Sequence, residues 1–159
     1  MNSSLDWMKR DNPNYDPNRI GNISEMKICT ALMAAGKLVW RPLVGFRPCD
    51  YLIEDGGAYH RVQCKTGRLF RGAIRFAPQR LRAAKRETGW QRCVKDYEGD
   101  VDFFGIYCPE LDSVYLVPIT VVGKQRSYSL RVSAARNNQR KQVHWAADYL
   151  VVPQSIPGC

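Results

Sequence analysis

The chain has 159 residues, of which 45% are hydrophobic, and it carries a formal net charge of +9. This length and apolar content suit one ordinary domain, and the excess of positive charge predicts an anionic partner, first of all a nucleic acid. No apolar run approaches the ~20 residues of a membrane-spanning helix, and the first ten residues lack an apolar signal core, so we expect a cytoplasmic protein without a membrane partner. Six cysteines without a C-x-x-C pair, together with only two histidines, argue against a zinc site.

The first expected element is a helix over residues 20–35. The polar residues 1–19 before it are expected to form a flexible N-terminal arm. Gly36 is placed as a helix stop, and Glu25 lies off the apolar stripe that predicts the helix. That stripe consists of Ile20, Ile23, Met26, Thr30 and Met33.

A short strand over 38–40, a loop over 42–48 and then a β-hairpin are expected next. The hairpin has strands at 51–53 and 59–65, joined by the turn Asp55-Gly56-Gly57. Asp50 stands at the start of its first strand. Gln63 and Lys65 are two residues apart, so they share one face of its second strand.

The rest of the chain predicts mainly strands. Residues 68–76 alternate in polarity and predict one strand with arginines on one face. Residues 78–87 fit a helix, although such a helix would be basic nearly all round. We further expect strands at 101–107 and 114–118, a short helix at 119–122, an edge strand at 126–132 and a last helix at 142–149. The boundaries of the single domain are then 20–152, with a C-terminal tail over 153–159.

Positive charge is concentrated in two segments. Residues 61–95 hold eleven Lys or Arg against one acid, and residues 124–141 hold six against none. Arg, Asn and Gln recognise base edges in the major groove, which also admits a two-stranded β-ribbon, while Lys and further Arg contact phosphates. The side chains that we expect to contact DNA, some of them on a basic β-ribbon, are Arg68, Arg71, Arg75, Arg80, Arg82, Lys124, Arg126, Arg131, Arg136, Asn137, Asn138, Gln139, Arg140 and Lys141.

Four residues form a candidate catalytic group: Glu25, Asp50, Gln63 and Lys65. The oxygens of Asp50, Gln63 and Glu25 are the hard ligands that suit Mg²⁺, for which Mn²⁺ is expected to substitute. Such an ion supplies a nucleophilic water near neutral pH and neutralises charge that develops on a phosphate. Lys65 adds a cation beside it. The sequence therefore predicts metal-dependent cleavage of a phosphodiester bond.

Several segments of the chain resemble one nuclease family. They are Gly21 to Glu25, Pro48-Cys49-Asp50, Gln63 to Gly67, Asp102 to Glu110, Asn137 to Gln139 and Trp145 to Tyr149. Over roughly residues 20–150 the sequence resembles the PD-(D/E)XK homing endonucleases encoded in bacterial group I introns, within the restriction-endonuclease-like superfamily. Two departures stand out, because Cys49 interrupts the Pro-Asp pair and Gln63 replaces the usual acid.

This resemblance implies an α/β fold with helices flanking a mixed β-sheet. It also implies Mg²⁺-dependent, sequence-specific cleavage of double-stranded DNA, as in intron homing. Asp50 and Gln63 correspond to metal ligands, Lys65 to the catalytic lysine and Glu25 to an acid on the helix. Because one site cuts one strand, cleavage of a duplex implies a homodimer or homotetramer.

Two alternatives share the fold. A structure-selective nuclease, such as a Holliday junction resolvase or a repair enzyme, needs few base contacts. The Asn/Gln/Arg-rich segment over 124–142 argues instead for sequence recognition. A non-catalytic DNA-binding protein on the same fold has no need of Asp50 or Lys65, and both are present.

Overall fold

The structure is a computed structural model that describes residues 3–9, 11–43, 48–86, 89–134 and 143–154. Its centre is a five-stranded mixed sheet in the order β1-β2-β3-β8-β9. The strands are β1 (Leu38–Trp40), β2 (Tyr51–Asp55), β3 (Ala58–Thr66), β8 (Phe103–Cys108) and β9 (Ser113–Pro118). The pairing of β3 with β8 is parallel, and the other pairings in this sheet are antiparallel. The predicted hairpin is thus confirmed as β2–β3, and β3 lies in the middle of the sheet.

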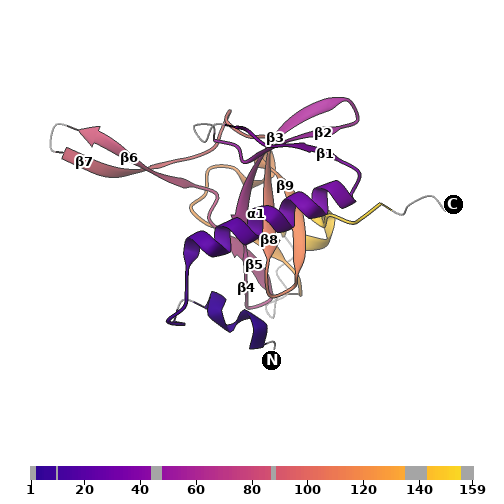
Figure 1. The fold of residues 1–159 in the computed structure, drawn as a ribbon, viewed down its shortest axis with the longest axis horizontal. Coiled ribbons are helices and arrows are strands. Elements are labelled where there is room, and N and C mark those ends of the chain that lie inside the picture. Colours follow the sequence, from indigo (N-terminus) through magenta and orange to yellow (C-terminus); the bar gives the residue numbers. More distant parts are fainter. Residues whose placement is uncertain (1–2, 10, 44–47, 87–88, 135–142, 155–159) are drawn as a thin grey trace.

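Helix α1 (Pro17–Ala34) crosses one face of this sheet (Figure 1). It begins three residues before the predicted start, because Pro17 occupies the first turn and the Asp16 carboxylate accepts hydrogen bonds from the backbone N–H groups of residues 18 and 19. The predicted apolar stripe is wrong. Met26 and Met33 are 69% and 61% exposed. The buried face repeats every four residues, through Ile20, Ser24, Ile28 and Leu32.

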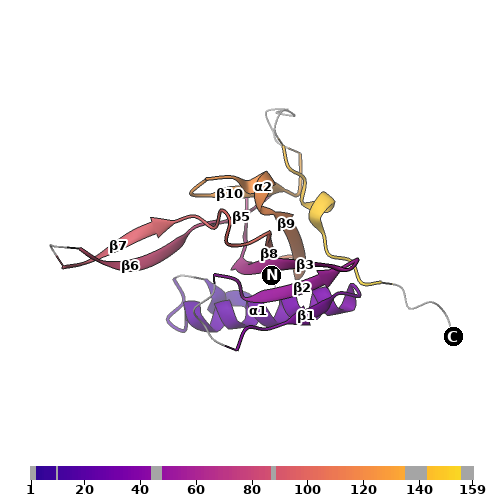
Figure 2. The same ribbon diagram turned by 90° about the horizontal axis from the view of Figure 1, so that it is seen from above.

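Two apolar clusters lie on the two faces of the sheet. Helix α1 lies on one side of the sheet, and the small sheet with β5 and β10 lies on the other (Figure 2). Under α1, Ile28 and Leu32 pack with Ile53 and Val62. On the other face, Phe104 and Ile106 of β8 pack with residues of a second sheet. Alternation along β3 therefore places Val62 and Cys64 toward α1, and it places Gln63 and Lys65 on the opposite face.

The second sheet has three strands in the order β10-β5-β4, namely β10 (Tyr128–Arg131), β5 (Ala73–Phe76) and β4 (Arg68–Phe70). The prediction of one strand over 68–76 is wrong, because the chain turns at Arg71 and Gly72, which have φ of 48° and 72°. The predicted faces hold only for β5, where Ile74 and Phe76 are buried and Arg75 is exposed. In β4 they are wrong, because the turn places Leu69 opposite Ile74 on the inner face and leaves Phe70 46% exposed. The predicted edge strand is confirmed as β10, and the predicted short helix as α2 (Ile119–Val122).

Strands β6 (Arg80–Arg86) and β7 (Gly89–Lys95) form a separate two-stranded ribbon that projects from the body of the protein (Figure 1). The helix predicted over 78–87 is therefore wrong. A segment that is basic nearly all round has no apolar face to hold a helix against the sheet. Pairing within the ribbon satisfies the backbone without that face. The basic two-stranded ribbon predicted from residues 68–76 is thus found at residues 80–95, whereas residues 68–76 form the β4–β5 hairpin of the small sheet.

Both ends of the chain pack on the domain over part of their length. A 3₁₀ helix (η1, Ser3–Met8) lies within the predicted arm, and Met8 is 3% exposed. The guanidinium of Arg19 lies 4.4 Å from the ring centre of Trp7. Near the other end, the helix predicted over 142–149 is wrong in extent, because the described part contains only the 3₁₀ turn η2 (Ala146–Tyr149). None of the described helices is long and apolar enough to span a membrane.

Candidate active site on the β2–β3 hairpin

The β2–β3 register brings Asp50 and Gln63 together. Tyr51 pairs with Val62, so the residue before β2 lies opposite Gln63. The Asp50 backbone N–H donates to the Val62 carbonyl at 2.9 Å. The carboxylate Oδ2 of Asp50 accepts hydrogen bonds from Gln63 Nε2 at 2.5 Å and from the Cys64 N–H at 2.7 Å. Hydrogen bonds within the hairpin thus fix both side chains.

Lys65 lies two residues further on, on the same face of β3 as Gln63. Its Nζ donates to the Gln79 carbonyl at 3.2 Å and to the Tyr97 hydroxyl at 3.1 Å. Burial lowers the pKa of Lys65, and the neighbouring charge of Arg80 lowers it further, whereas the charge of Asp50 raises it. The predicted convergence of Asp50, Gln63 and Lys65 is therefore seen in the geometry of the hairpin.

The pKa of the Asp50 carboxyl is raised above its ordinary value in spite of its hydrogen bonds. Burial raises its pKa, while the Cys64 N–H, the charges of Lys65 and Arg41 and the Gln63 amide lower it, and the net shift is upward. Among the described residues, both of these hydrogen bonds end on Oδ2, so Oδ1 is the oxygen that a cation would approach. Within the described residues no three His, Cys, Asp or Glu side chains gather as a metal site. The donor set is thus carboxylate oxygen plus the neutral Gln63 amide oxygen, which suits a hard divalent ion such as Mg²⁺.

Glu25 approaches from the α1 side of the sheet rather than from the face of Lys65. The preceding residue, Ser24, is buried and shares a 2.6 Å hydrogen bond with Thr66 Oγ1, which anchors α1 to the end of β3. Burial raises the pKa of Glu25, and the negative charge of Asp50 adds to that shift, so the two carboxylates lie close enough to interact. Glu25 is therefore near Asp50, on the helix that covers the sheet.

Arg41 is a residue of this site that the sequence did not single out. It directly follows β1, and its guanidinium donates to Glu25 Oε2 at 3.3 Å. Its charge lowers the pKa of both Glu25 and Asp50. The β1–β2 pairing is the feature that identifies Arg41, because Trp40 pairs with Leu52 and the next residue must then approach the start of β2.

Asp102 holds the sheet together at the same end. Its carboxylate accepts hydrogen bonds from the backbone N–H, Nε and Nη2 of Arg61 at 2.7, 3.1 and 2.9 Å. These bonds join β3 to the residue before β8 and lower the pKa of Asp102. Asp102 thus directly precedes β8 and ties it to β3.

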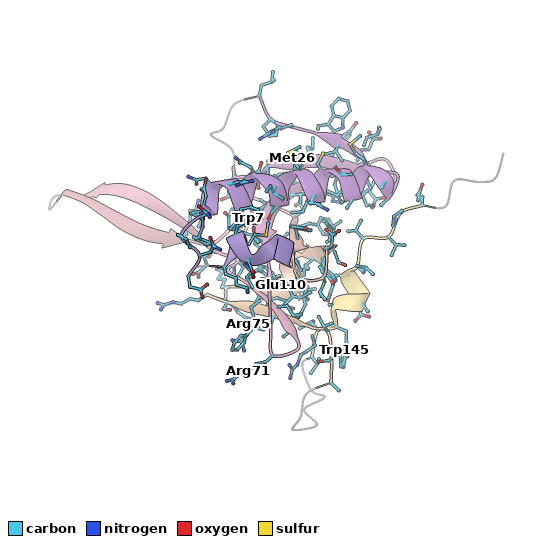
Figure 3. All side chains as sticks on the ribbon, turned by 60° about the horizontal axis from the view of Figure 1, so that its bottom comes forward. Trp7, Met26, Arg71, Arg75, Glu110 and Trp145 are labelled. Atoms are coloured by element: carbon cyan, nitrogen blue, oxygen red, sulfur yellow. The ribbon has the colours of Figure 1, made fainter. Side chains whose placement is uncertain are left out.

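The arginines of the small sheet differ in the exposure and the contacts of their guanidinium groups. Arg71 and Arg75 are exposed and lie at the outer side of the sheet (Figure 3), with the ring of Phe70 5.1 and 4.6 Å from their guanidinium carbons. Arg68 is engaged elsewhere, because it donates to the Met8 carbonyl at 2.7 Å and approaches Glu110. Arg131 donates to the Arg71 carbonyl at 3.2 Å.

The other predicted DNA-contacting residues fall into four groups. Arg80 is 12% exposed and forms an ion pair with Asp100, an environment that favours a structural role over the predicted DNA contact. Lys124 and Arg126 are exposed, and Lys124 pairs with Glu98. Arg82 belongs to β6, where only its backbone is described. The other predicted contacts lie outside the described residues: Arg136, Asn137, Asn138, Gln139, Arg140 and Lys141.

Residues 15–152 match the family model of the PD-(D/E)XK endonucleases, which covers most of the chain. The chain belongs to this family. It is a PD-(D/E)XK DNA endonuclease, and nucleases of this family use divalent metal ions. No curated protein matches the sequence.

Among solved structures, the bacterial homing endonuclease I-Ssp6803I matches with a TM-score of 0.64 at 20% identity, over 85% of this chain and 88% of that one. At this identity the match shows a shared fold. The predicted restriction-endonuclease-like α/β fold, with a mixed sheet flanked by helices, is thereby confirmed.

Proposed function

We propose that this PD-(D/E)XK endonuclease is a Mg²⁺-dependent, sequence-specific enzyme that cleaves double-stranded DNA in the manner of homing endonucleases. The observation that carries the proposal is the convergence of Asp50, Gln63 and Lys65 at one end of β3. These residues come from two strands that pair directly, so the site does not depend on a distant loop.

Asp50 and Gln63 are the residues that would hold the metal ion, with Glu25 completing the set from α1. A bound divalent ion would supply a water of lowered pKa and a positive charge against the scissile phosphate. Because Gln63 is neutral, the protein ligands carry less negative charge than two or three acids would. We therefore expect metal affinity to rise when DNA phosphate joins the site.

Lys65 supplies a fixed cation on the face of β3 that carries Gln63. An ammonium group in a half-buried site stabilises charge that develops on a phosphate more strongly than one in bulk water. Arg41 pairs with the Glu25 carboxylate at 3.3 Å, and its charge opposes the rise in the pKa of Glu25 that burial and Asp50 cause. The protein groups thus divide into oxygen donors for the ion and cations for the phosphate.

DNA is proposed to lie across two basic surfaces. One is the outer face of the small sheet, with Arg71 and Arg75 exposed there. The other is the β6–β7 ribbon, whose register places Arg82, Arg86 and Gln91 on one face. A two-stranded ribbon fits the major groove, where Arg and Gln recognise base edges. The predicted contacts over 136–141 remain part of this proposal.

Cleavage of both strands requires two active sites. We propose a homodimer or homotetramer with two-fold symmetry. A cytoplasmic location and replacement of Mg²⁺ by Mn²⁺ remain predictions from the sequence.

The proposal is tested by incubating the protein with Mg²⁺ and a library of randomised duplexes, followed by sequencing of the new ends. Ends that share a motif are the expected result, and EDTA or Asp50→Ala should abolish them. A four-way DNA junction is assayed in parallel. Cleavage of the junction without any motif in the library would instead identify a structure-selective nuclease.

A further inference from the structure

The ammonium group of Lys65 is held by both ends of the β6–β7 ribbon where the ribbon joins the body of the protein. Gln79, which directly precedes β6, accepts a hydrogen bond from Lys65 Nζ at 3.2 Å through its carbonyl. Tyr97, two residues after β7, accepts one at 3.1 Å through its hydroxyl. The same Nζ lies 4.8 Å from the centre of the Tyr97 ring.

Tyr97 is itself firmly placed. It is 4% exposed, and its ring meets Phe104 edge-on at 5.5 Å between centres. Its backbone carbonyl accepts hydrogen bonds from the N–H groups of Asp100 and Val101 at 2.9 and 3.2 Å. The guanidinium of Arg80, held by Asp100, lies 5.0 Å from the ring centre. A tyrosine so fixed can orient a lysine, whose four-carbon side chain is otherwise flexible.

We propose that Tyr97 is a positioning residue for Lys65. The phenol hydroxyl and the Gln79 carbonyl set the direction of the ammonium group, so the base of the ribbon belongs to the same unit as the catalytic strand β3. This inference rests on the proposed function, because it takes Lys65 to be the catalytic lysine. A DNA duplex bound by the ribbon then contacts the same two strands whose ends hold the Lys65 ammonium group.

The chain offers a matched control in Tyr128. It too is 4% exposed, packs in the same apolar cluster and contacts an aromatic ring, that of Phe76, at 5.7 Å. Within the described part of the chain its hydroxyl has no hydrogen-bond partner. Removing this hydroxyl changes a buried tyrosine in the same way as at Tyr97 but leaves Lys65 untouched.

The experiment compares Tyr97→Phe, Tyr128→Phe and Lys65→Ala with the wild-type protein. Three quantities are measured for each: the single-turnover cleavage rate at saturating duplex with Mg²⁺, the Kd for that duplex in EDTA, and the Tm. Rates are taken at a temperature at which every variant is folded. Misplacing a catalytic group by a small distance costs rate rather than binding.

The expected result for Tyr97→Phe is a cleavage rate lowered about 10- to 100-fold, with Kd within twofold of wild type. Its Tm should fall below that of Tyr128→Phe, because Tyr97 loses a hydrogen bond to a buried ammonium group and Tyr128 loses a hydroxyl without a partner among the described residues. Tyr128→Phe should cleave as the wild type does. Equal rates for Tyr97→Phe and wild type, or a loss that Tyr128→Phe shares, would overturn the positioning role. If Lys65→Ala cleaves normally, the proposed function fails; if Lys65→Ala is inactive and Tyr97→Phe is not, only this inference fails.

Discussion

The two hairpins β2–β3 and β6–β7 are built alike and placed differently. Each consists of two antiparallel strands joined by a short connection. Strand β3 pairs on both sides and is covered by apolar clusters, whereas β6 and β7 pair only with each other and stand apart from the body (Figure 1). The first hairpin fixes its side chains on a rigid support, and the second extends a basic surface into solvent.

In the proposed function, the β2–β3 hairpin carries the residues that cleave the phosphodiester bond and the β6–β7 hairpin carries residues that bind DNA. Groups that act on a scissile phosphate need accurate placement, which a central strand with buried neighbours provides. A surface that follows a DNA groove needs reach and positive charge more than burial. The contacts of Lys65 with Gln79 and Tyr97 connect the two hairpins at one point.

The largest expected effect comes from the carboxylate of the β2–β3 hairpin. Asp50→Asn removes the charge that we propose binds the metal ion and should lower cleavage by about 10³-fold or more, since a metal ion contributes several kcal/mol to the transition state. Because the pKa of Asp50 is raised in the folded protein, ionisation of Asp50 lowers the free energy of unfolding. This loss is absent below the unfolded pKa near 3.8 and is complete once the pH exceeds the folded pKa. Without metal, the Asn variant should therefore melt at the same temperature or higher. A clear fall in its Tm would contradict this account of Asp50.

A smaller effect is expected from the β6–β7 hairpin. The double variant Arg82→Ala, Arg86→Ala should weaken duplex binding by about 1–3 kcal/mol per arginine that contacts a base. The cleavage rate at saturating DNA should stay near that of the wild type. Lys27→Ala serves as a control, because it removes an exposed positive charge of α1 that is paired with Asp112 and should leave duplex binding unchanged. A large loss of rate with unchanged affinity would contradict the division between the two hairpins.

Gly67, which lies between β3 and β4, tests how closely the two sheets approach each other. A Cβ atom there would lie 2.6 Å from Ile74 Cγ2 and 2.8 Å from Ile106 Cγ2, in the apolar cluster opposite α1. Gly67→Ala should destabilise the protein by about 1–3 kcal/mol in urea unfolding, as overpacked cores do. Gly21→Ala has no neighbour within 4 Å of the new methyl group and lies within α1, so it should leave stability unchanged or raise it. Equal stabilities of the two variants would argue against the close approach of the sheets.

The smallest effect concerns the Arg61–Asp102 bridge beside β3. The pKa of Asp102 is lowered mainly by the Arg61 hydrogen bond, so its stabilisation is present above the unfolded pKa near 3.8 and is lost as pH falls through the folded value. The two side chains are 40% and 35% exposed, which limits the contribution to about 1 kcal/mol. Unfolding measured between pH 3 and 6 should show a shallower acid dependence for Asp102→Asn. An unchanged slope would show that the bridge does not contribute.

The sequence predicted the β2–β3 hairpin because two physical signals agree there. The first strand starts with the apolar run Tyr51 to Ile53, Val62 and Cys64 alternate with polar residues in the second, and Gly56 and Gly57 supply the positive φ values of the turn. The same alternation put Gln63 and Lys65 on one face. The convergence of these two residues with Asp50 followed from strand pairing alone.

Other elements could not be predicted because their determinants are not local. The ribbon at 80–95 lacks the apolar periodicity that distinguishes a helix from a strand. In α1, Met26 and Met33 fit helical spacing, yet the sheet selects Ser24, Ile28 and Leu32 for burial.

The same limit applies to the candidate site. Arg41 follows a strand of only three residues, so its approach to Glu25 depends on pairing between β1 and β2. Tyr97 contacts Lys65 across 32 residues of chain, and the sequence pattern of residues 78–87, which lie between them, predicts a helix in place of β6. Contacts of this kind depend on the tertiary fold.

The central claim is that Lys65 on β3 acts in the chemical step and not in DNA binding. The most direct test is the single-turnover cleavage rate of Lys65→Ala at saturating duplex with Mg²⁺, with the Kd of the same duplex measured in EDTA. The account predicts that cleavage is lost while Kd stays within a few-fold of wild type. Cleavage near the wild-type rate would contradict it.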